Sequence, residues 1–486
     1  VAAIISAIAL PAPVLAIEDE ILVTARKREE NLQEIPLPVT AFSSEQLERL
    51  QIQTIDDVGR NTPGLSFAKA FGRTTERPVI RGLGNVLAGV QFGVESGAAY
   101  FVDGIYYPGD LQSLNIRDIE RVEVIKGPQS ALYGRNTYSG AINFVTRRPG
   151  DSAAGDARMR FGQDGDFEIT GGVDGPLVEG VLDGGLSARY YSFDGEYTNI
   201  VTGETVGDEQ TRALSGSLRW TPHEDLTIST RLNLQNDDDG TRAFFLQPSE
   251  SNNCFPGTRS NALWNSVTGS TNQNQYFCGE INRPADYVQL NDGPALGGAP
   301  PVIPGVLDVP FPGFGPPVDP YNPAQGVAFS GVERDLFYLS LQTEWDIQGS
   351  GWTAVAAGAY RDDDRKTGSD SDHTSVNYIS TAGGECGLCA SERDDVSDYS
   401  VELRLESPVQ NRLRGLIGTY YFDQEIDGSD ITFTDLDGGD DEWNFWMHED
   451  GLFGLFPLGN GRYRAVAGAP SDFKADRQRS EEHTSE

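Results

Sequence analysis

Apolar and polar residues alternate in a series of short stretches from residue 157 onward. Because successive side chains of a β-strand point to opposite faces, this period of two predicts strands with one apolar and one polar face. No window after residue 16 offers the run of about 18 apolar residues that a membrane-spanning helix needs. The alternating stretches are residues 157–161, 186–193, 213–220, 226–234, 336–345, 352–360, 399–405 and 413–422.

The links between these strands alternate between tight and long. Residues 221–225, 347–351 and 407–411 are tight, whereas the long links are acidic and rich in glycine and proline. Short turns on one side, long loops on the other and aromatic residues at the strand ends are typical of a transmembrane β-barrel. A soluble β-sandwich explains the alternation but not the one-sided loop lengths. The long links are 235–333, 362–396 and 423–470, and the aromatic residues are Tyr190, Tyr191, Phe193, Trp220, Trp345, Trp352, Tyr360, Tyr420, Tyr421 and Phe422.

The residues before 150 have a different pattern. Residues 43–47 (SSEQL) and 54–57 (TIDD) are typical of capped helix starts, the second in the pattern of a capping box. Short stretches of strand-forming residues follow them. These helices and strands predict a small α+β domain. The strand-forming stretches are 78–81, 99–102, 122–125 and 141–146.

The chain opens with an apolar run, residues 1–16, that has the length of a signal peptide. Val14 and Ala16 stand at the −3 and −1 positions of a cleavage site, which predicts export. The run has no Met and no basic start, so the true N-terminus stays open. An N-terminal membrane anchor fits less well, because Pro11 and Pro13 interrupt a segment that is already short.

A strand-forming stretch, EILVTA at residues 20–25, follows with no neighbouring strand in the sequence, and charged residues come directly after it. An unpaired strand leaves its backbone N–H and C=O groups open to any sheet edge that a partner offers. The stretch therefore raises the question of which edge it pairs with.

The formal charge of −36 narrows the range of partners. Binding to nucleic acid relies on clusters of Lys and Arg that this chain lacks, so no nucleic-acid partner is expected. Solvated acidic loops are the simplest interpretation of the charge.

The four cysteines fall into two sequence pairs, Cys254 with Cys278 and Cys386 with Cys389. In an exported protein both pairs predict disulfides that close loops. A zinc site would need further ligands, and His373 is the nearest histidine. A redox role for Cys386 and Cys389 is less favoured, because they lie between acidic, Gly-rich stretches rather than at a helix start.

No pattern of residues predicts a catalytic site. The four histidines are scattered, and no nucleophile and base stand together, so neither enzyme activity nor a cofactor is expected. Oxygen ligands at alternate positions of the stretch 435–442 suit calcium. A solvated acidic loop is the simpler interpretation of that stretch, and no metal site is predicted.

A set of motifs resembles one family, the TonB-dependent receptors of the Gram-negative outer membrane. The motifs span residues 20 to 177. The resemblance implies an α+β plug domain followed by an antiparallel transmembrane β-barrel, which in this family has about 22 strands. In order, the motifs are EILVTARKREE, IPLPVTAFS, NTPGLSF, VIRGLG, YFVDGIYY, IERVEVIKGPQSALYGRNTYSGAINFVTRRP and DGPL.

With the resemblance, the sequence is expected to divide into five parts. Residues 1–16 are a signal peptide, 17–35 a TonB box with its tether, and 36–150 the plug. Residues 151–478 are the N-terminal part of the barrel, with about nine or ten strands. The tail 479–486, RSEEHTSE, looks like a translated sequencing adapter and is expected to be non-native.

The resemblance also implies partners and site residues. The protein would pair with TonB by strand addition at the box and would lie in outer-membrane lipid. Two cations would latch the plug to barrel glutamates, and plug apices would contact a small-molecule ligand such as a metal chelate. The box is Glu20, Ile21, Leu22, Val23, Thr24 and Ala25, the latch is Arg81 and Lys126, and the expected ligand contacts are Phe71, Arg73, Phe92, Tyr106 and Tyr107.

The implied function is TonB-dependent uptake of a scarce bulky solute, with a ferric siderophore as the first choice and cobalamin or glycans as alternatives. A signalling receptor would carry an extra domain before the box, and here only residues 17–19 separate the box from the cleavage site. A passive porin would need no plug. An exported enzyme on a β-scaffold is the alternative from another class.

Overall fold

The structure is a computed structural model. It describes residues 21–52, 54–69, 76–84, 96–109, 118–199, 205–241, 287–288, 331–370, 389–408, 415–427, 432–434, 444–448, 451–459 and 462–468. Several predictions from the sequence lie outside these residues. They are the signal peptide, Glu20 of the box, Phe71, Arg73, Phe92, Cys254, Cys278, Cys386, the side chain of Cys389, the stretch 435–442 and the tail 479–486.

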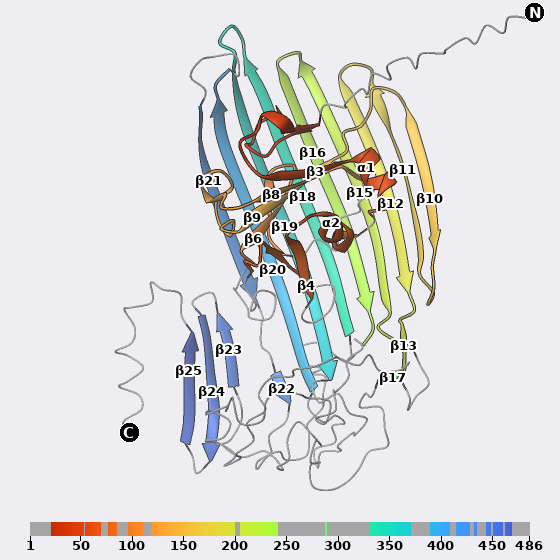
Figure 1. Cartoon of the computed structure of the whole chain (residues 1–486), viewed down its shortest axis with the longest axis vertical. Helices are drawn as coiled ribbons and strands as arrows, with labels where there is room; N and C mark the ends of the chain where they lie inside the picture. Colours follow the sequence, from red (N-terminus) through yellow and green to blue (C-terminus); the bar gives the residue numbers. More distant parts are fainter. Residues whose placement is uncertain are drawn as a thin grey trace, which may run out of the picture.

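One large antiparallel sheet, which we call the wall, contains the long strands (Figure 1). Its strands follow one another in chain order, apart from β22, which pairs with β20. This arrangement confirms the predicted class of an α+β domain followed by an antiparallel sheet that resembles part of a barrel. The strands are β10 (Ala154–Phe161), β11 (Phe167–Val178), β12 (Leu182–Phe193), β15 (Glu209–His223), β16 (Leu226–Asp239), β18 (Gly331–Ile347), β19 (Trp352–Asp370), β20 (Cys389–Glu406), β21 (Leu416–Asp427) and β22 (Thr432–Thr434).

The alternating stretches of the sequence lie in these strands, but the strands are longer than predicted. β19 continues to Asp370, into the predicted link 362–396. The alternation did not reveal this part of the strand, because charged residues replace apolar ones on its inner face. β11 was not predicted, since its glycines break the alternation. The predicted link 423–470 also contains strands, which corrects that assignment. They are β22 and a separate sheet of β23 (Asn444–His448), β24 (Gly451–Gly459) and β25 (Arg462–Gly468).

The wall has an apolar outer face and a polar inner face. On β18 the outward Leu339 and Leu341 are 41% and 52% exposed, whereas the inward Tyr338 and Ser340 are 3% and 7% exposed. Phe337 contacts Tyr360 on the outer face, and Trp345 lies eight residues further along the same strand. At about 3.3 Å per residue, the two aromatic levels are about 26 Å apart along the strand. Because the strands of a membrane barrel tilt by about 35–45°, this distance corresponds to about 20 Å of height, most of an apolar band that is about 25 Å tall.

Part of the predicted aromatic girdle lies on the inner face instead. Tyr191 donates a hydrogen bond to Glu209 at 3.2 Å, and Phe422 contacts the ring of Tyr106. Tyr420 pairs across the sheet with the inward Glu402. The face on which each ring lies is set by the alternation of side chains along the strand. The prediction used only the closeness of these residues to strand ends, which does not give the face.

No helix in the part of the chain that the structure describes is long and apolar enough to cross a membrane.

Residues 32–150, which we call the plug, fold separately around a five-stranded mixed sheet that lies against the inner face of the wall (Figure 1). This sheet has the order β3-β8-β9-β6-β7, and β6 runs parallel to β9. A hairpin of β4 and β5 stands beside it. The strands are β3 (Val39–Ser43), β4 (Leu65–Lys69), β5 (Glu76–Ile80), β6 (Ala98–Val102), β7 (Ile105–Tyr107), β8 (Ile119–Lys126) and β9 (Gly140–Thr146).

Two predicted helix starts of the plug are confirmed. Ser43 and Gln46 form a capping box at α1 (Ser44–Arg49), and Thr54 and Asp57 form another at α2 (Ile55–Asn61). Each box satisfies backbone N–H groups that a first helical turn leaves unpaired. The remaining helical turns are η1 (Leu32–Glu34) and α3 (Ser130–Tyr133).

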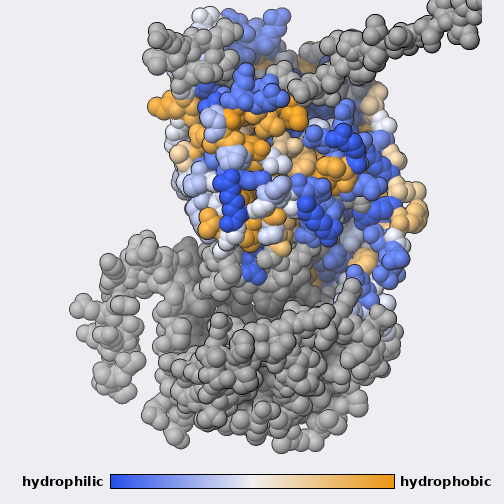
Figure 2. Space-filling view, viewed as in Figure 1, coloured by the Kyte–Doolittle hydropathy of each residue, from blue (hydrophilic) through white to orange (hydrophobic). Residues whose placement is uncertain are grey.

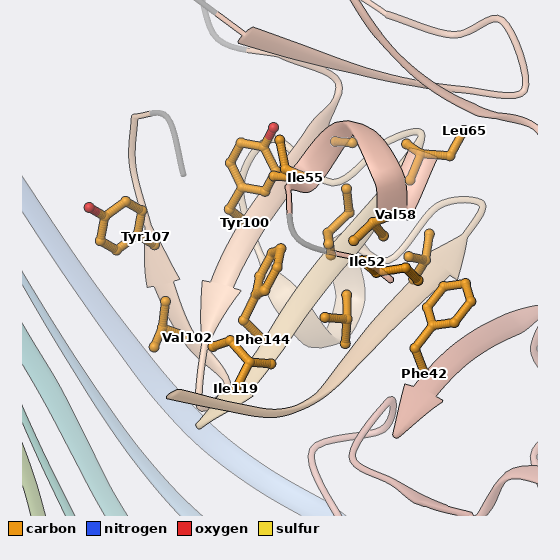
Figure 3. Close-up of a cluster of buried hydrophobic side chains, with 14 of the residues drawn as sticks. Phe42, Ile52, Ile55, Val58, Leu65, Tyr100, Val102, Tyr107, Ile119 and Phe144 are labelled. Carbon is orange, nitrogen blue, oxygen red and sulfur yellow. The ribbon is translucent and has the colours of Figure 1, made fainter. Parts of the chain in front are cut away.

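One apolar cluster of the plug joins its N-terminal elements to its central strands. Phe42, Ile55 and Val58 from the N-terminal elements meet Ile119 and Phe144 from the central strands (Figure 3). Gly140 permits this close packing, because a Cβ there would lie 2.4 Å from the carbonyl oxygen of Ile125. In the view of Figure 2, polar and apolar residues are interspersed over the visible face of the described residues.

Short elements lie among the longer wall links. These are β13 (Tyr197–Asn199), β14 (Thr205–Val206) and β17 (Tyr287–Val288), which form a small sheet of their own.

Candidate functional site

The strand-forming stretch near the start of the chain has a partner within its own chain. β1 (Leu22–Val23) pairs antiparallel with β2 (Glu30–Asn31), which folds residues 21–31 back on themselves. We call residues 21–31 the docked segment. Val23 and Ala25 have no exposed surface and pack in a cluster with Phe101. The expectation of a solvated tether after residue 25 is therefore not met, because this segment is packed into the plug.

A buried carboxylate of the plug binds the docked segment. Glu123 has no exposed surface, and its Oε1 accepts the backbone N–H of Thr24 at 2.8 Å. The Thr24 hydroxyl donates to the same carboxylate at 3.0 Å, and Arg121 donates to it at 2.7 Å. Asn143 donates to it at 3.3 Å. A buried charge needs such donors, so Thr24 is part of what makes Glu123 tolerable in the core.

Further bonds hold the same threonine. The side-chain amide of Asn143 donates to the Thr24 hydroxyl at 3.1 Å, and the hydroxyl of Tyr133 donates to the Thr24 carbonyl at 3.2 Å. Sequence reasoning missed Glu123 and Asn143. The sequence did carry one signal for Glu123. It is a charged residue within the apolar strand RVEVI, both faces of which are buried.

Two successive cations join the docked segment to the wall. Lys27 Nζ donates to the Gly104 carbonyl at 2.7 Å and to Glu402 of β20 at 2.9 Å. The ammonium also lies over the rings of Phe101 and Tyr133, at 5.5 and 5.1 Å from their centres. Burial lowers the pKa of Lys27, against the attraction of Glu402.

Arg28 extends the same contact toward the end of β20. It pairs with Glu406 at 3.4 Å and donates a hydrogen bond to the Gly415 carbonyl. Arg404 lies between Glu402 and Glu406, at 3.2 and 2.6 Å, and keeps both carboxylates in place. This cluster is the main ionic contact between the docked segment and the wall.

The predicted latch of Arg81 and Lys126 is not formed with the wall. Lys126 donates to the carbonyl of Pro63 at 2.7 Å, within the plug, and burial together with the nearby Arg81 lowers its pKa. Arg81 is exposed, and neither cation pairs with a wall carboxylate within the described residues. Asp118 makes a plug-to-wall contact instead, accepting from Ser187 at 2.7 Å and pairing with Arg231 at 3.3 Å.

The two predicted ligand contacts that the structure describes are buried. Tyr106 and Tyr107 are 5% and 2% exposed. Tyr107 lies 5.3 Å from the ring of Tyr338, and Tyr106 lies 5.4 Å from that of Phe422. Both rings therefore pack between the plug and the wall, and their role as ligand contacts stays a prediction. The strand position predicted exposure at an apex, but β7 runs along the wall.

A ladder of charges stiffens the wall beside Tyr107. Arg334 makes two bonds of 2.7 Å to Asp363, and Arg361 bridges Asp363 and Asp398 at 3.0 and 2.7 Å. Such paired, two-pronged contacts have fixed geometry. Among the described residues, no group of three or more His, Cys, Asp or Glu side chains is placed to hold a metal ion.

Comparison with known proteins shows which family this chain is similar to. Residues 31–141 match the family model for the TonB-dependent Receptor Plug Domain. The chain is 29% identical over 229 residues to the vitamin B12 transporter BtuB of Photobacterium profundum, covering 43% of this chain and 37% of that protein. It is 27% identical over 211 residues to the ferrioxamine receptor of Yersinia enterocolitica, covering 42% and 27%. The chain thus matches between 27% and 37% of the length of these relatives.

Solved structures show the same fold at low identity. The ferric yersiniabactin uptake receptor FyuA of Yersinia pestis superposes with a TM-score of 0.58 at 14% identity, over 89% of this chain and 60% of that one. The pyoverdine outer membrane receptor FpvA of Pseudomonas aeruginosa PAO1 gives 0.55 at 15% identity, over 92% and 60%. These likenesses confirm the predicted fold class.

Reversing the charge of Lys27 should release the docked segment. In Lys27→Glu a carboxylate would face Glu402, and the Gly104 carbonyl would lose its hydrogen-bond donor. Breaking a buried ion pair costs about 3–5 kcal/mol. A spin label at Leu22, which is 46% exposed, should become mobile in the full-length receptor.

Two variants control this measurement. Arg26→Glu reverses the neighbouring charge, but Arg26 pairs with Glu30 inside the segment and is 38% exposed, so the label should stay ordered. Lys27→Glu combined with Glu402→Lys should restore order. An ordered label in Lys27→Glu alone would show that the Lys27 contact does not hold the segment.

The docked fraction should also rise with pH in the alkaline range. The pKa of Lys27 is lowered by burial when docked and returns toward its ordinary 10.5 on release, so the released state binds more protons. Raising the pH through the lowered value up to 10.5 therefore favours docking. The neighbouring Tyr133 does not interfere, because burial raises its pKa. The label at Leu22 should lose mobility over this range in the native protein and show no such change in Lys27→Met.

Proposed function

We propose that the protein is a TonB-dependent receptor that takes up a scarce, bulky solute across the outer membrane of a Gram-negative bacterium with the help of TonB. The observation that carries the proposal is the plug packed against the inner face of the wall, with the docked segment fastened to both. A passive pore has no use for such an arrangement. The exported enzyme receives no support from the described residues, and the relatives are named as transporters and receptors.

The membrane location is supported by the outer face of the wall. Leucines and aromatic rings project from it, and its two aromatic levels are about 26 Å apart along β18, as expected for strands that cross a hydrocarbon core. The polar inner face is covered by the plug. Outer-membrane lipid is therefore the proposed surrounding of the wall.

TonB is the proposed partner of the docked segment. Strand addition needs an extended stretch whose backbone is available, and β1 is held by only two pairs with β2. A competing sheet edge can replace that short pairing. To be captured, Val23 and Ala25 must leave the core, and Thr24 must leave Glu123. Part of the force applied through TonB would break these contacts.

The proposed cargo is a ferric siderophore. A ferrioxamine receptor is among the relatives, and receptors for ferric yersiniabactin and pyoverdine share the fold. Phe71, Arg73 and Phe92 stay predicted ligand contacts. Cobalamin is the second candidate, because two of the similar proteins are vitamin B12 transporters. One of these, from Vibrio vulnificus (strain CMCP6), is 30% identical to this chain over 156 residues.

Val23→Pro should abolish uptake while leaving ligand binding at the cell surface unchanged. Proline lacks the backbone N–H that an added strand would share with TonB. Val23 is also buried in the plug, so proline at this position would release the docked segment as well as impair pairing with TonB. A control must separate these two effects. Lys27→Glu provides that control, since it loosens the segment but keeps the box, and it should still transport. Uptake in Val23→Pro equal to that of the native receptor would place the TonB contact elsewhere.

Deleting the complete gene should impair growth when iron is supplied only as a ferric siderophore. Uptake of ⁵⁵Fe-labelled siderophores and of ⁵⁷Co-labelled cobalamin in the deletion strain, compared with the complemented strain, distinguishes the two cargo classes. Loss of cobalamin uptake alone would replace the siderophore proposal with the second candidate. Loss of neither would contradict both.

A further inference from the structure

A cavity of about 300 Å³ lies between the plug and the wall, at the end of the sheet that carries the short links. The docked segment forms one side of it through residues 24–29. Plug residues 145–149, which follow β9, form another side, and strands β15 to β20 close it. Of the predicted ligand contacts that the structure describes, neither Tyr106 nor Tyr107 lines the cavity.

The charge of this cavity is opposite to that of the chain. The chain carries a formal −36, yet among the residues that the structure describes, eight Lys and Arg side chains line the cavity against four Asp and Glu. Ion pairs account for six of these cations, and three of the pairs, those of Lys27, Arg28 and Arg231, join the wall to residues before 150. These six are Lys27, Arg28, Arg121, Arg148, Arg231 and Arg404.

Ion pairing does not account for the other two cations, Arg147 and Arg219. Within the part of the chain that the structure describes, neither side chain has an ion pair or hydrogen bond, although both are partly buried. Arg147 follows plug strand β9, and Arg219 comes from wall strand β15, so they approach the cavity from opposite sides. Withdrawing a guanidinium from water without a partner is unfavourable. Both guanidinium groups keep part of their surface open and line the cavity, so their N–H donors are available to an anionic partner that enters it.

The rest of the lining suits the same partner. Ser217 and Ser229 place hydroxyl groups on the wall side of the cavity. Guanidinium and hydroxyl donors together match the oxygen atoms of carboxylates and related oxyanions, and arginine can bind them with two parallel bonds.

We propose that this cavity is an anion-binding chamber that cargo crosses between the plug and the wall, and that the cargo therefore carries anionic oxygen groups. The crossing of the chamber by cargo rests on the proposed function, whereas the binding of anions in the chamber does not. When the docked segment leaves, the chamber loses one side together with Lys27 and Arg28. Arg147 and Arg219 stay, since they belong to the plug body and the wall. The chamber then opens toward the short-link end while keeping its two unpaired cations.

Binding is tested without transport, in the full-length receptor purified in detergent. Selenate is the probe, and its selenium is located by anomalous diffraction and its affinity measured by equilibrium dialysis. Selenate should occupy the chamber in contact with Arg147 or Arg219. Arg147→Gln combined with Arg219→Gln should weaken binding about tenfold or more, because each charge-assisted bond contributes about 1.5–3 kcal/mol.

Arg212→Gln is the matched control. Arg212 lies on the outer face of the same strand β15, is exposed and bonds to Gln210, so its loss should leave selenate binding unchanged. Thermal unfolding of each variant checks that the plug is still folded and docked. Equal selenate binding in the double variant, or selenium found only outside the chamber, would mean an adventitious ion only and would overturn the proposal.

Passage is tested by the charge of the cargo in cells. The double variant should slow uptake of an anionic ferric tricatecholate several-fold while its surface binding is unchanged, and should slow cationic ferrioxamine B less. Equal slowing of both would overturn the charge selection. If the native receptor takes up no ferric chelate and no cobalamin, the proposed function and the crossing fail together, while the selenate measurement still decides whether the chamber binds anions.

Discussion

The arrangement of the plug depends on one buried carboxylate. Glu123 has no exposed surface, and an isolated charge in such a place is very unfavourable unless donors surround it. Arg121 and Asn143 supply part of those donors from the same sheet, but Thr24 supplies two more from the docked segment. The segment is thus required by the core it packs against. Its removal leaves Glu123 less well satisfied, which makes docking a property of the plug interior and not only of its surface.

Several elements follow from local sequence, because local forces decide them. The capping boxes at Ser43 and Thr54 were readable, since a helix start is settled by residues three apart. The wall strands were readable from alternation, although β11 was missed where glycines replace the apolar positions. The family motifs identified the plug, and the fold class was confirmed. Strand ends were less well predicted, because the inner face of β19 continues in charges rather than in apolar residues.

The contacts of the site were not predictable in the same way. Lys27 and Glu402 are separated by 375 positions, and nothing in either neighbourhood indicates the other. Arg81 and Lys126 were assigned to the wall by resemblance, but Lys126 reaches the carbonyl of Pro63 within its own domain. Tyr107 was expected at an open apex, whereas its ring packs on Tyr338. Each of these outcomes depends on how the plug lies against the wall, which is tertiary information.

The docked segment and the cavity share residues, and this couples two events that could otherwise be independent. Lys27 and Arg28 hold the segment to β20, and the same side chains line the chamber. Pulling the segment away therefore frees Glu402 and Glu406 at the moment when the chamber opens. Arg404 remains between these two carboxylates and limits the repulsion they would exert on an anion. In the proposed opened chamber, Arg404 would thus stay paired with the two freed carboxylates, and Arg147 and Arg219 would remain available to an anion.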